Sequence, residues 1–304
     1  MAAVSQTGSA SSGRRHMSDG TLVKLFIIPT LALLILWNVF PLFYSLYLSF
    51  TRYSAIDNKP PDWRGTQNYV NILKDKNLWE SFATTGRFAV LSVGIQTVLG
   101  FSLAMLLRNK FRGSGIITTL ILIPMMLSPV VVGMFWKNIY NPGWGIFNYL
   151  LDPINPQRAN DMLGNRATTM LAAVIVDVWM WTPFVMLLCL SGLSAIPDYL
   201  YEAAAIDRAS SWFQFRRITL PQVAPLLMIA ILFRTIEALK AFDIMQGLTG
   251  GTNGTETVSI ELYKLAFQGQ VATGRASALA YIVLIIVICI SNVYIRSLNR
   301  MRGE

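Results

Sequence analysis

The chain has 304 residues, of which 54% are hydrophobic and only 13% are charged, and its formal net charge is +9. Apolar runs of about twenty residues recur along it, which excludes an ordinary soluble core and predicts a polytopic membrane protein. Its single histidine, His16, excludes a histidine-based metal or catalytic site, and the lack of a GxxxxGK[ST] sequence excludes a P-loop for ATP.

The apolar runs predict an all-α fold, a bundle of six membrane-spanning helices. The predicted spans cover residues 25–50, 86–107, 116–136, 168–190, 223–248 and 277–295. The first run is too long, and too far from a small-residue cleavage site, for a removable signal peptide. Residues 25–304 form the expected membrane domain, and residues 1–24 the expected disordered cytoplasmic tail. Prolines inside the spans predict kinks at Pro29, Pro41, Pro124, Pro129 and Pro183.

The distribution of basic residues predicts the orientation of the chain. The short segments 108–115 and 296–304 each carry three Lys or Arg residues, whereas the loops on the opposite side are longer and closer to charge balance. Basic residues are retained on the cytoplasmic side of inner membranes, so both termini are expected in the cytoplasm. Anionic headgroups of the lipid bilayer then account for the net charge, and no nucleic-acid partner is expected.

This orientation places residues 201–221, YEAAAIDRASSWFQFRRITLP, in the cytoplasm between the fourth and fifth spans. Pro197 and Asp198 are typical of the start of one short helix. Ser211 and Gln214 have the spacing of a capping box for a second helix, and Pro221 predicts its end. Small alanines and bulky aromatics on such a pair suit docking on another protein, and they also suit an amphipathic pair lying on the inner leaflet.

The spacing of this stretch resembles the EAA loop of binding-protein-dependent ABC importer permeases. The family pattern is EAA, three residues, Gly, nine residues and then I-x-L-P. The matching residues are Glu202, Ala203, Ala204, Ile218, Leu220 and Pro221. Arg208 stands at the glycine position, where glycine would ease a left-handed turn, so the geometry of the turn stays open.

Three further segments resemble sugar permeases of the maltose and glycerol-phosphate type. They are WRGTQNYVNILKDKNLWESFATTGRF at 63–88, LIPMMLSPVVVGMFWKNIYNPGWGIFNYLL at 122–151 and LKAFDIMQGLTGGTNGTET at 239–257. The NPGWGIFN sequence in the second segment is similar to the first of the two permeases that such systems use. Together with the loop, these segments extend the resemblance over residues 25–304.

The resemblance implies a type I ABC importer permease fold and a role in transport. The loop at 197–221 would form a coupling helix that seats in a cleft of an ATPase subunit, with Glu202 as an anchor and Asp207 and Arg208 as further contacts. The implied partners are a second homologous permease, two ABC ATPase subunits that bind ATP and Mg, an extracytoplasmic solute-binding protein and a carbohydrate substrate. The chain itself would be no enzyme, would bind no cofactor and would lie in a bacterial inner membrane.

Charged residues in the predicted fifth span leave two interpretations. Arg234, Glu237, Lys240 and Asp243 alternate in sign at three-residue spacing, so each can meet its neighbour on the helix surface. They either line a translocation pathway or form ion pairs that hold this helix in the bundle.

The fourth span leaves the same choice at Asp177, Trp179 and Trp181. Aromatic faces with a few polar groups hold sugars, but tryptophans near span ends also sit in interfacial belts or pack against a neighbouring helix. The candidate pathway residues are Asp177, Trp181, Glu237, Lys240, Phe242 and Asp243.

Two other classes of function fit the residues less well. A secondary transporter driven by an ion gradient would carry an intramembrane carboxylate without a basic partner, whereas Glu237 and Asp243 have Arg234 and Lys240 beside them. A membrane-embedded enzyme would need a metal-ligand cluster or a nucleophile with its base, and no histidine lies within the spans.

Overall fold

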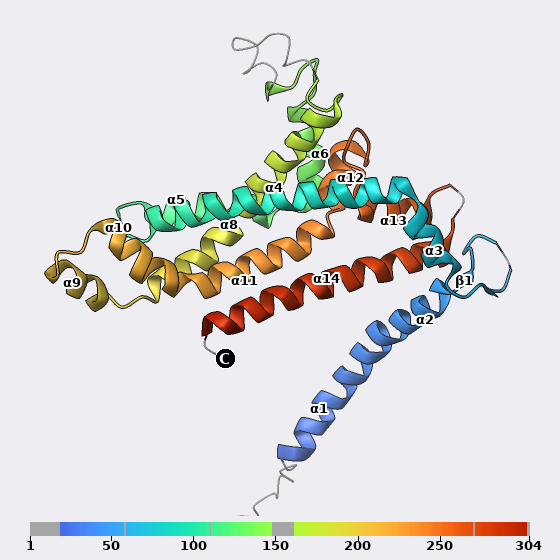
Figure 1. The fold of residues 1–304 in the computed structure, drawn as a ribbon, viewed down its shortest axis with the longest axis horizontal. Helices are drawn as coiled ribbons and strands as arrows, with labels where there is room; N and C mark the ends of the chain where they lie inside the picture. The colour runs from blue at the N-terminus through green and yellow to red at the C-terminus, as the bar shows by residue number, and fades with distance from the viewer. Residues whose placement is uncertain (1–18, 58, 110, 148–160, 270, 303–304) are drawn as a thin grey trace, which may run out of the picture. The chain divides into compact units, whose positions relative to one another are not determined.

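A computed structural model describes residues 19–57, 59–109, 111–147, 161–269 and 271–302. These residues form helices joined by loops, with one short antiparallel pair of strands (Figure 1). The chain divides into two units between Tyr47 and Leu48. Most of the expected disordered tail, residues 1–18, lies outside the described residues, whereas residues 19–24 belong to the first helix.

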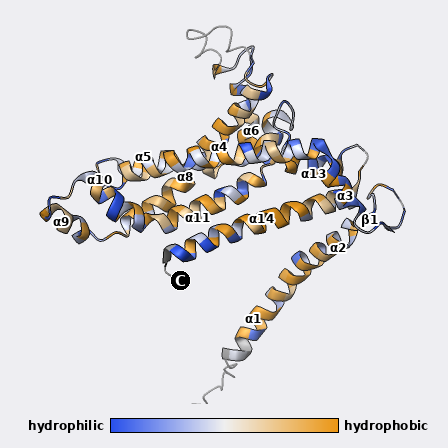
Figure 2. Cartoon of the chain, in the orientation of Figure 1, coloured by the Kyte–Doolittle hydropathy of each residue, from blue (hydrophilic) through white to orange (hydrophobic). Residues whose placement is uncertain are grey.

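The first unit is one long apolar helix that contains a π-helical turn. α1 (Asp19–Leu34) continues through η1 (Ile35–Val39) into α2 (Phe40–Ser49). Pro29 and Pro41 each remove a backbone donor, and a π turn is one way in which a helix absorbs such a loss. Figure 2 shows this helix coloured mainly as hydrophobic, and most of its large apolar residues are exposed, as expected of a helix that faces lipid.

The second unit carries the remaining elements. They are β1 (Thr51–Arg52), β2 (Asp62–Trp63), α3 (Gln67–Lys74), α4 (Lys76–Leu107), α5 (Ser114–Leu122), η2 (Pro124–Met126), α6 (Pro129–Ile139), α8 (Arg166–Ser194), α9 (Tyr199–Ile206), α10 (Ser211–Gln214), η3 (Phe215–Thr219), α11 (Leu220–Leu239), α12 (Asp243–Thr249), α13 (Val258–Phe267) and α14 (Thr273–Arg302). In the described part of the chain, five helices are long and apolar enough to cross a membrane: Val23–Ser49, Lys76–Leu107, Arg166–Ser194, Ser211–Leu239 and Thr273–Arg300. The predicted all-helical membrane fold is confirmed.

The predicted third span, 116–136, is a broken helix. α5 ends at Leu122, and α6 begins only at Pro129. Pro124 and Pro129 cannot donate hydrogen bonds to the preceding turn, and the backbone of Ser128 between the two helices is extended. Five of the six predicted spans therefore each coincide, at least in part, with one of the five long helices, and the third is made of two shorter helical pieces.

The predicted fifth span, 223–248, is wrong at both ends. Its helix begins earlier, because α10 and η3 lead into α11 without a break, and the continuous helix covers Ser211–Leu239. It ends earlier at Lys240, whose amide bonds back to Glu237 O, and α12 starts anew at Asp243.

Glycines set the closest helix contacts of the bundle. α4, α8 and α11 pack against one another, and a Cβ on Gly100 of α4 would lie 2.7 Å from the Cβ of Val185 on α8. α6 and α12 meet at Gly133 and Gly247, where a Cβ on Gly247 would lie 2.5 Å from the carbonyl oxygen of Val130. Small residues allow this close approach of membrane helices. Gly133 and Gly247 let α12 pack closely on α6, and this packing also holds the break after α11 against the bundle.

Candidate functional site

The EAA-like stretch folds as two short helices joined by a Schellman turn. α9 ends at Ile206, the amide of Arg208 donates to Ala205 O at 3.0 Å, and the amide of Ala209 donates to Ala204 O at 2.9 Å. This motif places a left-handed residue just after the helix, and Arg208 takes that position with a φ of 55°. The glycine of the family pattern thus stands where the backbone must be left-handed. A residue with a side chain adopts this conformation at a cost of about 1–2 kcal/mol.

The cap of the second helix differs from the predicted capping box. Ser210, not Ser211, caps α10, and its hydroxyl accepts a hydrogen bond from the amide of Phe213 at 3.3 Å. The side chain of Gln214 does not reach back to the cap; it donates to Ala209 O at 3.2 Å. Either serine of the 210–211 pair could act as the N-cap. Ser210 does so, because its backbone is extended, as an N-cap residue requires.

The predicted helix stop at Pro221 is also wrong. Pro221 lies in the first turn of α11, directly after the π turn η3. Across that turn, the amide of Leu220 already bonds to the carbonyl of Phe215, so the hydrogen-bond register is shifted before the proline is reached. As a result, the end of the EAA-like stretch and the fifth span are one helix.

An apolar groove of about 540 Å³ lies between the two short helices. The residues that line it are Leu200, Ala203, Ala204, Asp207, Ala209, Ser210 and Phe213. Glu202 is exposed beside this groove, and Ile206 and Trp212 expose 83% and 68% of their surface. Exposed apolar surface of this kind is typical of sites that contact another protein or a membrane.

Two contacts that the sequence analysis missed hold this stretch in place, one to the end of α4 and one between α9 and η3. The guanidinium carbon of Arg108 lies 4.1 Å from the centroid of the Tyr201 ring, within the range of a cation–π interaction. The hydroxyl of Tyr201 lies 2.9 Å from that of Thr219 on η3. From the sequence, Arg108 could be interpreted only as a basic residue near the membrane, because no spacing rule relates it to Tyr201.

The six predicted pathway residues line one small cavity, although they come from separate elements. Asp177 and Trp181 belong to α8, Glu237 to α11, Lys240 and Phe242 to the break after it, and Asp243 to the start of α12. Phe88, Pro129, Arg234, Ala241 and Ile244 complete the lining. The cavity holds about 70 Å³, far less than the roughly 300–1,000 Å³ of ligand pockets, so this chain alone does not enclose a whole sugar here.

A buried polar network forms the wall of this cavity. Arg234 Nη2 lies 3.1 and 3.0 Å from the two carboxylate oxygens of Asp177, and Arg234 Nε donates to Gln96 Oε1 at 2.9 Å. Gln96 Nε2 in turn donates to Asp177 Oδ2 at 2.7 Å. Arg234 and Asp177 are only 3% and 4% exposed, and the Arg234 guanidinium lies over the Trp181 ring at 4.7 Å. The network joins α4, α8 and α11.

The predicted alternation of charge along one helix face is only partly right. Lys240 Nζ does lie 2.9 Å from Glu237 Oε1, and both side chains are exposed. Arg234 instead forms its ion pair with Asp177 on α8, and Asp243 stands on a separate helix. The contribution of Gln96 could not be expected from a pattern of charges, because it is neutral and lies on another span.

Trp179 does not share the cavity with Trp181. The two side chains lie on different sides of α8, and the Trp179 ring packs edge-on against Trp136 of α6 with centroids 5.5 Å apart. For Trp179 the structure supports the packing interpretation.

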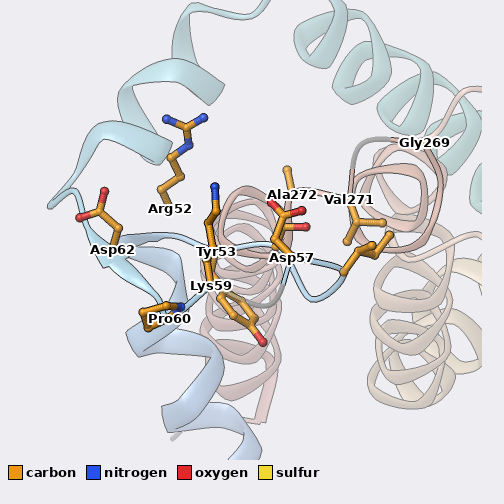
Figure 3. Close-up of a pocket in the computed structure, with 11 residues that line it drawn as sticks. Arg52, Tyr53, Asp57, Lys59, Pro60, Asp62, Gly269, Val271 and Ala272 are labelled. Carbon is orange, nitrogen blue, oxygen red and sulfur yellow. The ribbon is translucent and has the colours of Figure 1, made fainter.

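A hollow of about 690 Å³ lies at the opposite end of the second unit from the EAA-like stretch (Figures 1 and 3). It lies between the β1–β2 segment and the residues that precede α14. Figure 3 shows the cationic ends of Arg52 and Lys59 on one side of the β1–β2 segment and the ring of Tyr53 on the other. Asp57 and Asp62 also line this hollow, so its surface carries both signs of charge.

The chain is similar to known proteins in sequence and in fold. The family described as "Binding-protein-dependent transport system inner membrane component" matches residues 96–300. The chain is 36% identical over 287 residues to the trehalose/maltose transport system permease protein MalF of Thermococcus litoralis, covering 94% of this chain and 96% of that protein. It is 33% identical to the trehalose transport system permease protein SugA of Mycobacterium tuberculosis, with coverages of 97% and 92%.

Among solved structures, the fold is similar to that of a chain from a bacterial ABC transporter involved in the import of the acidic polysaccharide alginate. The TM-score is 0.77, and the match covers 91% of this chain and 96% of that chain. At 21% sequence identity, this likeness concerns the fold.

Proposed function

Because this chain belongs to the family of binding-protein-dependent transport system inner membrane components, we propose that it forms half of the pathway by which an ABC importer moves a carbohydrate across a bacterial inner membrane. The trehalose and maltose permeases to which it is similar along nearly its whole length support a carbohydrate substrate. The chain has no P-loop of its own, so ATP and Mg are bound and ATP is hydrolysed by partner subunits.

The EAA-like stretch is the proposed docking element for an ATPase subunit. Its small residues Ala203 and Ala204 allow a partner helix or cleft to approach closely, and Glu202 stands exposed beside them for a charge-assisted hydrogen bond. At the turn, Asp207 supplies a further polar contact, and Arg208 takes the left-handed backbone conformation. Ile218 faces the bundle and, with Leu220 and Pro221, connects the docking element to the fifth span.

The observation that carries the proposal is the continuous helix Ser211–Leu239. It begins at the docking element and carries Arg234 and Glu237 of the polar cavity near its far end. Ser211 and Arg234 are separated by about 35 Å along the axis at about 1.5 Å per residue. A movement of the ATPase subunits against α9 and α10 is therefore passed along this continuous helix to the cavity.

The polar cavity is the proposed part of the sugar pathway. Asp177, Glu237, Lys240 and Asp243 offer donors and acceptors, and Trp181 and Phe242 offer aromatic surface. This is the usual composition of a carbohydrate site, in which polar groups orient the ligand and aromatic faces contact its CH groups. A second, homologous permease would supply the opposite wall.

The orientation follows from the docking element. With α9 and α10 in the cytoplasm, both termini are cytoplasmic, and the hollow beside the β1–β2 segment faces outward. Its exposed charges suit the docking of an extracytoplasmic solute-binding protein. The lining residues Arg52, Asp57, Lys59 and Asp62 are the proposed contacts.

The test is purification of the tagged chain from its native membrane in mild detergent, followed by an ATPase assay with and without substrate-loaded binding protein. We expect a second permease and a P-loop ATPase in the preparation, with hydrolysis stimulated by the loaded binding protein. A chain that purifies alone and moves solute with an ion gradient would overturn the proposal.

A further inference from the structure

The charge balance of the polar cavity bears on the class of sugar that it accepts. Its lining contains two cations, Arg234 and Lys240, and three carboxylates, Asp177, Glu237 and Asp243. Each cation is paired with a carboxylate, Arg234 with Asp177 and Lys240 with Glu237. Asp243 forms no ion pair with any residue that the structure describes. The lining therefore carries one negative charge in surplus and no unmatched cation.

Arg234 is held rigidly, yet part of its hydrogen-bonding capacity is unused. Its Nε is bonded to Gln96, its Nη2 to Asp177, and one face of its guanidinium lies over Trp181. Within the described ranges, its other terminal nitrogen, Nη1, has no hydrogen-bond partner. A guanidinium donates through all three of its nitrogens, so Nη1 can still bond to a group that enters the cavity.

We propose, resting on the function proposed above, that Arg234 is the specificity-determining contact of this half of the pathway and selects uncharged carbohydrates. Nη1 donates a hydrogen bond to a hydroxyl or ring oxygen of the sugar, while Asp177 cancels the charge of the guanidinium. The surrounding network keeps the donor in one orientation.

The selection has an electrostatic cause. A phosphate, sulfonate or carboxylate group that leaves water needs an unmatched cation to replace its hydration. In this cavity it meets cations that are already paired, and the surplus carboxylate of Asp243 repels it. A sugar hydroxyl carries no charge, so it loses less on leaving water and needs only a donor or an acceptor.

The experiment measures the specificity of the permease without its binding protein. The complex of this chain with its partner permease and ATPase subunits is placed in lipid nanodiscs, both free of nucleotide and with ATP bound. Equilibrium binding is measured for maltose and trehalose as uncharged probes, and for maltose 6′-phosphate and trehalose 6-phosphate as their anionic counterparts. We expect the wild-type complex to bind the uncharged sugars at least roughly tenfold more tightly.

Two variants remove the matching carboxylates. Asp177→Asn leaves Arg234 unmatched, and Glu237→Gln leaves Lys240 unmatched. Each is expected to shift the binding ratio toward the phosphorylated probe by roughly tenfold. Glu237 is exposed, so its variant folds even if Asp177→Asn does not. The matched control is Glu261→Gln, which removes the partner of Lys264 on α13 outside the cavity and should leave the ratio unchanged.

The results separate this inference from the proposed function. Receptor-stimulated ATP hydrolysis by the same preparations reports on the importer itself. If hydrolysis is retained while Glu237→Gln has the wild-type ratio, the charge inference is wrong and the importer stands. A wild-type complex that binds the phosphorylated sugars as tightly as the uncharged ones, or that binds neither, also overturns the inference. Absence of partner subunits and of hydrolysis instead overturns the proposed function.

Discussion

Arg234 of α11 and Asp177 of α8 form a buried ion pair, with Arg234 Nη2 3.0 Å from Asp177 Oδ2. The two residues are 57 positions apart in the sequence, and Gln96 of α4 bonds to both of them. One polar network thus fixes three spans at the level of the cavity. In an apolar surrounding, such a network is favourable only as long as all its members are satisfied.

Removal of Asp177 should destabilise the bundle. In Asp177→Ala the guanidinium of Arg234 stays buried without its counter-ion, and breaking a buried ion pair in this way costs about 3–5 kcal/mol. We expect a clearly lower midpoint of thermal unfolding for the detergent-solubilised complex. Glu261→Gln, which removes a more exposed carboxylate from a helix-surface pair, serves as the control. Equal midpoints for Asp177→Ala and wild type would show that the network contributes no stability.

Replacement of Arg208 by glycine should be tolerated and should stabilise the turn. Arg208 has a φ of 55°, and glycine takes this conformation without the cost of about 1–2 kcal/mol that an L-residue bears. Arg208→Ala keeps that cost while removing the charge, so it separates geometry from contact. The readouts are thermal unfolding and receptor-stimulated ATP hydrolysis. A large loss of hydrolysis in both variants would mean that the guanidinium itself contacts a partner.

Reversal of charge at Glu202 should uncouple transport from ATP hydrolysis. Glu202 is exposed beside the groove between α9 and α10, and a lysine there would repel the basic group that we expect across the interface. Sugar uptake by cells that carry Glu202→Lys should fall to background, while binding of the solute-binding protein to the complex is unchanged. Wild-type uptake by this variant would remove Glu202 from the interface.

A side chain at Gly247 should force α6 and α12 apart. A Cβ there would lie 2.5 Å from the carbonyl oxygen of Val130, and neither backbone can move freely. Gly247→Ala is expected to lower the unfolding midpoint and to impair uptake, since α12 carries Asp243 at the cavity. The control is Gly94→Ala on α4, where a Cβ meets nothing within 4 Å. If both variants unfold at the same temperature, the close approach is not required.

Truncation of Trp181 should alter transport of the sugar without loss of assembly. The indole lines the cavity and covers the Arg234 guanidinium. Trp181→Ala removes an aromatic face worth roughly 0.5–2 kcal/mol to a cation and an apolar surface for the sugar. We expect a several-fold lower rate of uptake at limiting sugar with the normal complement of subunits in the purified complex. Unchanged uptake kinetics would assign the tryptophan to packing alone.

The sequence predicts those parts of the molecule that depend on local composition. Apolar runs located the membrane helices, and fixed spacing located the residues from Glu202 to Pro221. The sequence could not show that the helix continues through Pro221, because this depends on the π turn that precedes the proline. The break at Lys240 was missed for a similar reason: no proline or glycine marks it, and α12 is held in place by contacts with α6.

Contacts between distant spans lie beyond what spacing can show. Gln96 has no charge and no motif, yet it joins Asp177 to Arg234. Arg108 and Tyr201 are likewise brought together only by the packing of α4 beside the end of α8. The candidate pathway residues do line one cavity, and their role in transport stays a prediction that rests on the cost of charged residues within spans.

The most direct measurement is sugar uptake into proteoliposomes that contain the purified complex, with loaded solute-binding protein outside and ATP inside. We expect uptake that requires both ATP and the binding protein, persists when ionophores collapse all ion gradients, and is lost in Glu202→Lys. Uptake by this chain alone, driven by an ion gradient and independent of ATP, would contradict its function as an ABC importer permease.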